Sequence, residues 1–211
     1  MKSKIIILNG SIRGTESNSY AVASRAAKFL SQKFKVETEI ITLSQPPKRI
    51  STLNKKLEAC SGLLVVSGTY WNNIGSPLQR FIEIFTPFEQ TPTFFGKPVA
   101  SVITMDSAGG LDVAGKIHAS FSGLGCWSPP CSTVVLSRVG LDAVKQTQNK
   151  KSDPNEDVWR EEDLEILLYN LATASVMPKV KWKSWPHVAF KLKKDTWPES
   201  GDIEMGAERF V

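Results

Sequence analysis

The sequence is poor in the residues from which metal centres and acid–base catalysts are built. Its 211 residues include two histidines and three cysteines. An odd number of cysteines without CxxC spacing argues against a disulfide framework, and the lack of His/Cys clusters gives no support for a metal site. We expect the three thiols to be inert core residues, at Cys60, Cys126 and Cys131.

Long hydrophobic runs are also missing. Only four apolar residues separate Lys4 from Asn9, too few for a signal peptide, and no stretch approaches the length of a membrane span. This pattern predicts a cytoplasmic protein that does not engage a membrane. The net charge is +5, with lysines clustered at 145–151 and 179–194, but no nucleic-acid-binding motif accompanies them. We interpret these lysines as a solvated basic face that favours anionic cofactors, and expect no nucleic-acid partner.

Three familiar nucleotide-binding and catalytic motifs are absent. There is no GxGxxG, and the second predicted strand ends in Thr42-Leu43-Ser44 where a dinucleotide-binding fold places an acidic residue. The absence of GxxxxGK[ST] excludes nucleotide hydrolysis of the P-loop type. There is no GxSxG either, and neither His118, on a predicted helix, nor His187, in the C-terminal region, suits a Ser-His-Asp triad.

Runs of apolar residues predict five strands that alternate with helices. The strands are expected at 5–8, 36–43, 63–66, 99–104 and 133–136. Helical spacing predicts five buried stripes, made of Ala23, Ala26, Ala27 and Leu30; Leu53 and Leu57; Leu78, Phe81, Ile82 and Phe85; Ala114, Ile117, Phe121 and Leu124; and Leu164, Leu167, Leu168 and Leu171. This alternation predicts a three-layer, doubly wound α/β domain with a five-stranded parallel sheet over residues 1–177.

Local signals mark where these helices begin and end. The first is expected to start at Ser19, and Ser76 is expected to cap the third, with Pro77 at its first position. Gly125 is expected to end the fourth. The last helix is expected to open at a capping box, Asp153-Pro154-Asn155-Glu156.

The C-terminal region, residues 178–211, breaks the α/β pattern. It holds Trp182, Trp185 and Trp197 among lysines and prolines, with no helical or strand period. A disordered tail rarely carries three tryptophans. We therefore expect an irregular but ordered arm, packed on its own subunit or a neighbour, that contributes to a homo-oligomer (a dimer or tetramer).

Three polar loops follow predicted strands and indicate where a ligand binds. In a parallel sheet such loops converge at the carboxyl ends of the strands. The first loop opens a helix. A helix cap alone would need one polar side chain, whereas this loop offers several groups that can bind an anion, from Ser11, Arg13, Ser17, Asn18 and Ser19. The second loop holds Thr69, Tyr70, Trp71, Asn72, Asn73 and Ile74. The third loop holds Asp106, Ser107, Gly109 and Gly110.

These loops suggest a phosphate in the first and a flat ring between the other two. Tyr70 and Trp71 offer aromatic faces, the backbone amides from Asn72 to Ile74 offer donors, and Gly109 and Gly110 allow close approach to a ring. Two simpler interpretations stay open. The aromatic residues could be plugs over the end of the sheet, and the glycines an ordinary turn before a helix.

The motifs resemble those of the NAD(P)H-dependent FMN reductases, a family of flavodoxin-like flavoproteins. Three segments carry the resemblance to this family: Asn9-Gly10-Ser11-Ile12-Arg13 with Ser17-Asn18-Ser19, the run from Gly68 to Glu83, and Phe95-Gly96-Lys97-Pro98-Val99-Ala100. The resemblance covers residues 4–137 and, less specifically, the last helix. Gly68 replaces a common proline, Gln79 replaces a common lysine, and the first loop is one residue longer. Asp106-Ser107 precedes the glycines of the third loop, where members vary.

The resemblance implies a flavodoxin-like fold and a flavin enzyme. FMN, or FAD in its place, would bind at the three loops and receive a hydride from NADPH or NADH. Electrons would then pass to a small-molecule acceptor: free flavin, a quinone, an azo compound or a metal oxyanion. Because the cofactor carries this chemistry, no catalytic side chain is expected. Two alternatives are a flavodoxin-type electron carrier without a substrate of its own, and a flavin-free scaffold that binds a protein partner through the arm.

Overall fold

The sheet of this protein sets the position of the three loops. The computed structural model describes residues 3–140 and 161–178, together with 180–184, 186, 192 and 194–198. Its one sheet is entirely parallel and has the order β2-β1-β3-β4-β5. The strands are β1 (Lys4–Asn9), β2 (Glu37–Thr42), β3 (Gly62–Gly68), β4 (Val99–Met105) and β5 (Thr133–Ser137). The five predicted strands are thus confirmed, and the direction of strand addition reverses between β1 and β3.

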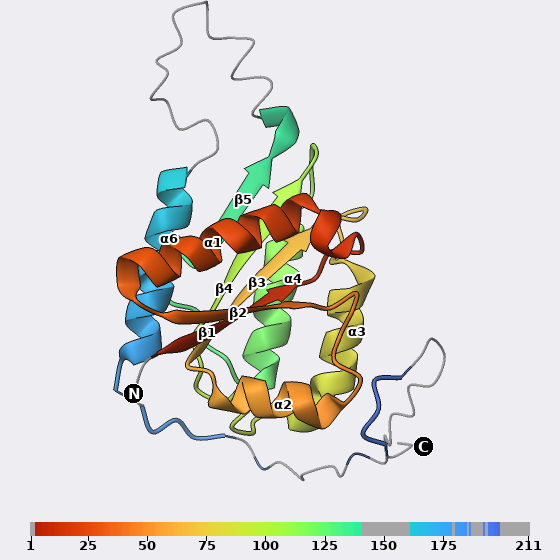
Figure 1. The fold of residues 1–211 in the computed structure, drawn as a ribbon, viewed down its shortest axis with the longest axis vertical. Helices are drawn as coiled ribbons and strands as arrows, with labels where there is room; N and C mark the ends of the chain where they lie inside the picture. The colour runs from red at the N-terminus through yellow and green to blue at the C-terminus, as the bar shows by residue number, and fades with distance from the viewer. Residues whose placement is uncertain are drawn as a thin grey trace, which may run out of the picture.

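Helices cover both faces of the sheet, as Figure 1 shows. One layer is formed by α1 (Asn18–Phe34) and α6 (Glu161–Val176), the other by α2 (Ile50–Ala59), α3 (Ser76–Phe85) and α4 (Gly110–Leu124). Ile5 and Ile7 of β1 face the first layer, and Ile6 and Leu8 face the second. Both faces of the central strands are therefore buried, which explains their unbroken hydrophobic runs. None of the described helices is both long and apolar enough to cross a membrane.

Three local predictions are wrong in detail. Gly75, not Ser76, is the N-cap of α3, and Ile84 takes the place of Ile82 in its buried stripe. A Cβ on Gly75 would lie 2.3 Å from the Gly10 carbonyl oxygen, so close packing against the first loop leaves no room for a side chain at this N-cap position. Cys131 is exposed in a turn at φ 55°, whereas Cys60 and Cys126 are buried as predicted. The capping box at 153–156 lies outside the described residues.

Residues 195–198 of the C-terminal arm pack on the α2–α3 layer of their own subunit. The Trp197 N–H donates to the Lys48 carbonyl, and its ring lies 6.5 Å from that of Phe85. The Arg80 guanidinium donates to the Pro198 carbonyl. Trp182, by contrast, is half exposed beside Gly96. Trp185 lies outside the described residues, and a role of the arm in assembly stays a prediction.

Candidate functional site

The first loop is folded by its own side chains. The buried Asn9 amide donates to the Gly14 carbonyl at 3.0 Å, and its oxygen accepts from the Ser11 N–H at 3.2 Å. Ser17 is the N-cap of α1: its hydroxyl accepts from the Tyr20 N–H at 3.0 Å and donates to Gly14 at 2.7 Å. The Ser17 hydroxyl thus makes its hydrogen bonds within the protein, as a helix cap does.

Hydroxyl pairs join the first loop to the other two. Ser11 Oγ lies 3.1 Å from the Tyr70 hydroxyl, which also accepts from the Ile12 N–H at 3.1 Å. Ser19 Oγ lies 2.7 Å from Thr104 Oγ1, at the end of β4. Ser11 and Ser19 are only 2% and 1% exposed, so their hydroxyls join the loops inside the protein and do not face a ligand.

The charge at this edge favours an anion, with one exception. Arg13 is exposed and has no ion-pair partner among the residues that the structure describes. Asn18, also exposed, is the first residue of α1, so the unpaired N–H groups and positive end of that helix point to the same region. The exposed carboxylate of Glu16 lies in the same loop and opposes them. The donors present nevertheless fit a phosphate monoester.

The second loop is a tight turn with a tryptophan at its tip. Tyr70 and Asn73 exchange backbone hydrogen bonds of 2.9 and 3.0 Å, and the two residues between them have positive φ, as in a type I′ turn: 50° for Trp71 and 57° for Asn72. Asparagine tolerates this conformation, but tryptophan rarely adopts it. The Trp71 side chain is 101% exposed. A strained backbone that holds an aromatic ring in solvent is a signal of function.

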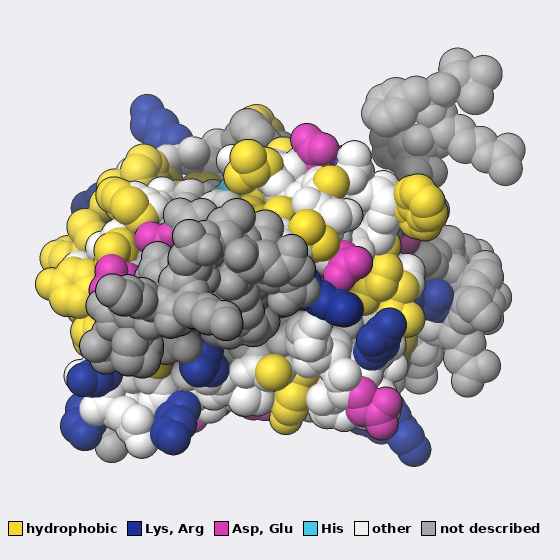
Figure 2. Space-filling model, turned by 90° about the horizontal axis from the view of Figure 1, so that it is seen from above, with side chains coloured by type: hydrophobic (Ala, Val, Ile, Leu, Met, Phe, Trp, Pro, Cys, Tyr) yellow, Lys and Arg dark blue, Asp and Glu magenta, His cyan; other side chains and the backbone are white. Residues whose placement is uncertain are grey.

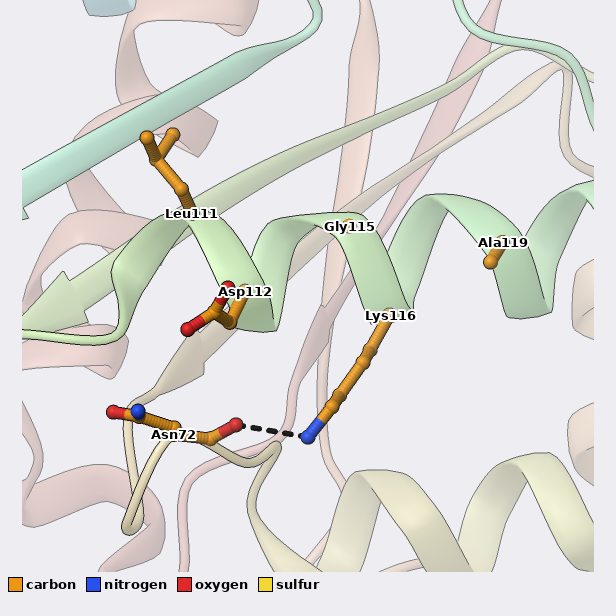
Figure 3. Close-up of a pocket in the computed structure, with 6 residues that line it drawn as sticks. All are labelled: Asn72, Leu111, Asp112, Gly115, Lys116 and Ala119. Atoms are coloured by element: carbon orange, nitrogen blue, oxygen red, sulfur yellow. Dashed lines mark hydrogen bonds between the residues drawn. The ribbon is translucent and has the colours of Figure 1, made fainter.

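Lys116 of α4 supports this turn, a contact that no sequence motif indicated. Its ammonium donates to the Asn72 carbonyl at 2.9 Å, as seen in Figure 3. It also donates to Asn73 Oδ1 at 3.2 Å. An open hollow of about 500 Å³ lies beside this contact, lined by Asn72, Leu111, Asp112, Gly115, Lys116 and Ala119. A helix residue 44 positions away therefore fixes the loop that presents Trp71.

The third loop meets the second at its glycines. Gly109 has φ 85°, and a Cβ there would lie 2.1 Å from Asn72 Oδ1. A Cβ on Gly110 would lie 2.3 Å from a methyl group of Val135. Close contact between protein segments is therefore sufficient reason for both glycines. Asp106 and Ser107 are exposed, and Arg138 lies 3.6 Å from the Asp106 carboxylate.

The site has an apolar rim. Four large hydrophobic side chains are exposed on the loops and helix starts at this edge: Ile12, Trp71, Leu111 and Val139. Figure 2 looks onto the end of the molecule toward which β4 and β5 point, and hydrophobic side chains reach the surface there among polar ones. A second hollow, of about 280 Å³, lies beside α1 and is lined by Asn18, Ala21, Val22, Arg25, Thr104, Met105, Leu136, Arg138 and Leu164. An anionic, partly aromatic ligand suits this surface.

The side chains of His118, Cys60 and Cys126, whose pKa values are shifted, lie away from the three loops. Burial lowers the pKa of His118, which contacts Ser101, Thr133 and Ser128 between α4 and the sheet. Burial raises the pKa of the Cys60 and Cys126 thiols, so both stay protonated. Within the described ranges no three His, Cys, Asp or Glu side chains gather as a metal site would require. His118, Cys60 and Cys126 are therefore not part of the three-loop site.

Comparison with known proteins gives the fold and the family. A search of curated protein sequences finds no match. Among solved structures, RosB with the bound intermediate 8-demethyl-8-formylriboflavin-5′-phosphate has a TM-score of 0.64 and 12% identity over 99% of both chains. A flavodoxin from the domain Archaea has a TM-score of 0.58 and 14% identity over 82% of this chain and 98% of its own.

A third solved structure, the apo form of the NADH:FMN oxidoreductase EmoB, has a TM-score of 0.61 and 15% identity over 82% of this chain and 90% of its own. These likenesses show a flavodoxin-like fold. A family model goes further, because the model for NADPH-dependent FMN reductase matches residues 3–140, which is most of the domain and all three loops. The chain belongs to the NADPH-dependent FMN reductase family.

Proposed function

We propose that this protein is an FMN-dependent NAD(P)H oxidoreductase. The observation that carries the proposal is the meeting of two features at one sheet edge. One is a helix N-terminus with the exposed Arg13, which has no ion-pair partner in the described part of the chain, and the other is the exposed Trp71 on a strained turn. The first suits a phosphate and the second a flat ring, and the sequence family agrees with both.

The residues of the site divide into two tasks. Arg13, Asn18 and the first N–H groups of α1 would bind the phosphate, while the buried Ser11 and Ser19 would hold the loops in place through Tyr70 and Thr104. Trp71 would cover the ring, while Tyr70, Thr69 and the backbone from Asn72 to Ile74 shape its surroundings. Bound FMN would supply the redox chemistry, taking a hydride from NAD(P)H and giving electrons to an acceptor.

We further propose a flat organic acceptor. The exposed apolar rim of Ile12, Trp71, Leu111 and Val139 favours stacking of a quinone, a free flavin or an azo compound. A metal oxyanion is strongly hydrated and gains little from such a rim. The basic net charge of +5 also fits an enzyme that attracts NAD(P)H better than it fits an acidic electron carrier of the flavodoxin type.

A second candidate follows from the length of one structural match. The likeness to RosB extends over 99% of this chain, whereas the likenesses to the flavodoxin and to EmoB extend over 82%. RosB is described with a modified flavin phosphate as its bound intermediate. A flavin phosphate could therefore be the reactant here rather than a permanent cofactor.

Titration of FMN into the purified protein tests the phosphate assignment. Arg13→Ala is expected to weaken binding by about 1.5–3 kcal/mol, or roughly 10- to 150-fold, because a charge-assisted bond to the phosphate is lost. Lys33→Ala, which removes an exposed cation at the opposite end of α1, is the matched control and should bind as wild type. Equal FMN affinity in Arg13→Ala and wild type would contradict the assignment.

Activity separates the candidates. The reductase proposal expects the FMN-loaded protein to oxidise NADPH or NADH without air and to pass the electrons to a quinone. Mass analysis of the flavin after turnover should return unmodified FMN. A flavin of altered mass would favour the second candidate, and a protein that binds FMN but does not oxidise NAD(P)H would point to an electron carrier.

A further inference from the structure

The hollow of about 280 Å³ beside α1 has no task of its own in the proposed function, which uses only Asn18 and Thr104 of the residues that line it. It lies over the carboxyl ends of β4 and β5, on the side of the sheet that α1 and α6 cover (Figure 1). The helix that supports the Trp71 turn, α4, packs on the opposite side. We call this space the β5 hollow.

The floor of the β5 hollow is apolar. Leu136 of β5 and Leu164 of α6 line it, and both belong to the core beneath α1 and α6. Met105, at the end of β4, adds a flexible thioether, which packs well against aromatic rings. The wall formed by α1 carries the short side chains of Ala21 and Val22, which leave the space open. An apolar ligand surface that enters the hollow is therefore removed from water.

The charge on the walls is positive. Of the described residues that line the hollow, Arg25 and Arg138 alone are charged. Asn18, Ala21, Val22 and Arg25 recur at intervals of three and four residues, so they form one face of α1. Arg138 comes from a different element, directly after β5. Two arginines above an apolar floor suit a ligand with an anionic head and an apolar body.

Three carboxylates lie beside lining residues without lining the hollow themselves. Asp106 lies 3.6 Å from Arg138, but the two side chains are 74% and 71% exposed, so this pair is weak and a ligand can replace it. Glu162 and Asp163 belong to the first turn of α6 and offset the positive end of that helix. The arginines, rather than the α6 dipole, are therefore the groups that attract an anion.

We propose that the β5 hollow binds a small aromatic carboxylate. Arg25 and Arg138 would hold the carboxylate group, and Leu136, Leu164 and Met105 would contact the ring. The volume lies at the low end of the range of ligand pockets, which fits a single ring better than a nucleotide. The proposal uses neither Arg13 nor Trp71, so it does not depend on FMN binding.

Calorimetric titration of benzoate into the flavin-free full chain tests the ligand class. Benzoate should bind in the millimolar range or more tightly. Acetate, which lacks the ring, and benzamide, which lacks the charge, should each bind at least ~10-fold more weakly, because each loses one half of the interaction. No benzoate binding at about 10 mM, or equal binding of benzoate and benzamide, would overturn the proposal.

Variants of α1 and of the residue after β5 test the location. Arg25→Gln and Arg138→Gln should each weaken benzoate binding roughly 10-fold or more, since each removes a charge-assisted hydrogen bond. Lys28→Gln is the matched control, because Lys28 is an exposed cation one turn further along α1 and does not line the hollow. Ala21→Trp would fill the space and should abolish binding, with Lys28→Trp as its control. Circular dichroism checks that each variant is folded.

A variant that gains affinity completes the test. Asp106→Asn should strengthen benzoate binding by up to about fivefold, because it frees Arg138 from its exposed ion pair. Binding that is unchanged in Ala21→Trp, or as weak in Lys28→Gln as in Arg25→Gln, would overturn the proposal. Binding lost in Arg13→Ala but kept in Arg25→Gln would overturn it as well, since benzoate would then occupy the first loop.

Discussion

Trp71 is held in a conformation that costs free energy and gains no packing. A residue with a Cβ in the left-handed region is strained by about 1–2 kcal/mol, and this side chain is fully exposed. We predict that Trp71→Gly raises the free energy of unfolding of the flavin-free protein by roughly 0.5–1 kcal/mol over Trp71→Ala, since only glycine removes the strain. Both variants should lose FMN affinity, because both lack the ring. Urea unfolding and FMN titration measure the two effects, and equal stability of the glycine and alanine variants would argue against strain.

At the same scale, the sequence predicted residue types better than it predicted partners. The hydroxyls, Arg13 and the aromatic pair of the site were evident from composition and their place after a strand. Their contacts were not, because Ser19 meets Thr104 and Lys116 meets Asn72 across 85 and 44 positions. Ser17 shows the limit most clearly, since the same hydroxyl suits a phosphate or a helix cap until its hydrogen bonds are known.

At the scale of elements, His118 lies where α4, β4 and β5 meet. The α4 imidazole lies 3.0 Å from Ser101 Oγ of β4 and 2.7 Å from Thr133 Oγ1 of β5, and burial lowers its pKa below the ordinary 6.5. The unfolded chain therefore binds a proton at a higher pH than the folded protein does. Stability should be full above the ordinary pKa and fall as the pH drops toward the lowered one. Urea unfolding between about pH 8 and pH 5 should show this decline, and His118→Asn should show a flatter curve. Equal slopes in both proteins would contradict the prediction.

Elements themselves were largely predictable because both layers bury continuous faces. The strands and helices follow the apolar runs, and because all five strands are parallel, the three loops that follow β1, β3 and β4 lie at one edge of the sheet. The errors arose where packing chooses between equivalent residues. Ile82 and Ile84 both flank the Phe81–Phe85 stripe, and only contact with the neighbouring layer buries Ile84. The backbone of Gly10 likewise leaves room only for glycine at the N-cap of α3.

At the scale of the whole molecule, the arm supplies a helix cap that α2 lacks. The N-cap residue of α2, Arg49, provides no side-chain hydrogen bond, whereas Asp195 accepts from the Ser51 N–H at 2.7 Å and from its hydroxyl at 2.6 Å. These bonds lower the pKa of the Asp195 carboxyl below its ordinary 3.8. The contact is therefore complete above that value and is lost as the pH falls through the lowered pKa.

We predict that Asp195→Ala releases the arm while the sheet stays folded. Hydrogen–deuterium exchange should rise across residues 192–198 and at the first turn of α2, because Trp197 and Pro198 are held beside this cap. Lys194→Ala, an exposed neighbour, is the control and should leave exchange unchanged. Ser51→Ala should reproduce part of the effect through loss of its hydroxyl bond, and adding it to Asp195→Ala should change little, since both act on one contact. Unchanged exchange in Asp195→Ala would mean that Trp197 and its packing on Phe85 hold the arm without the carboxylate.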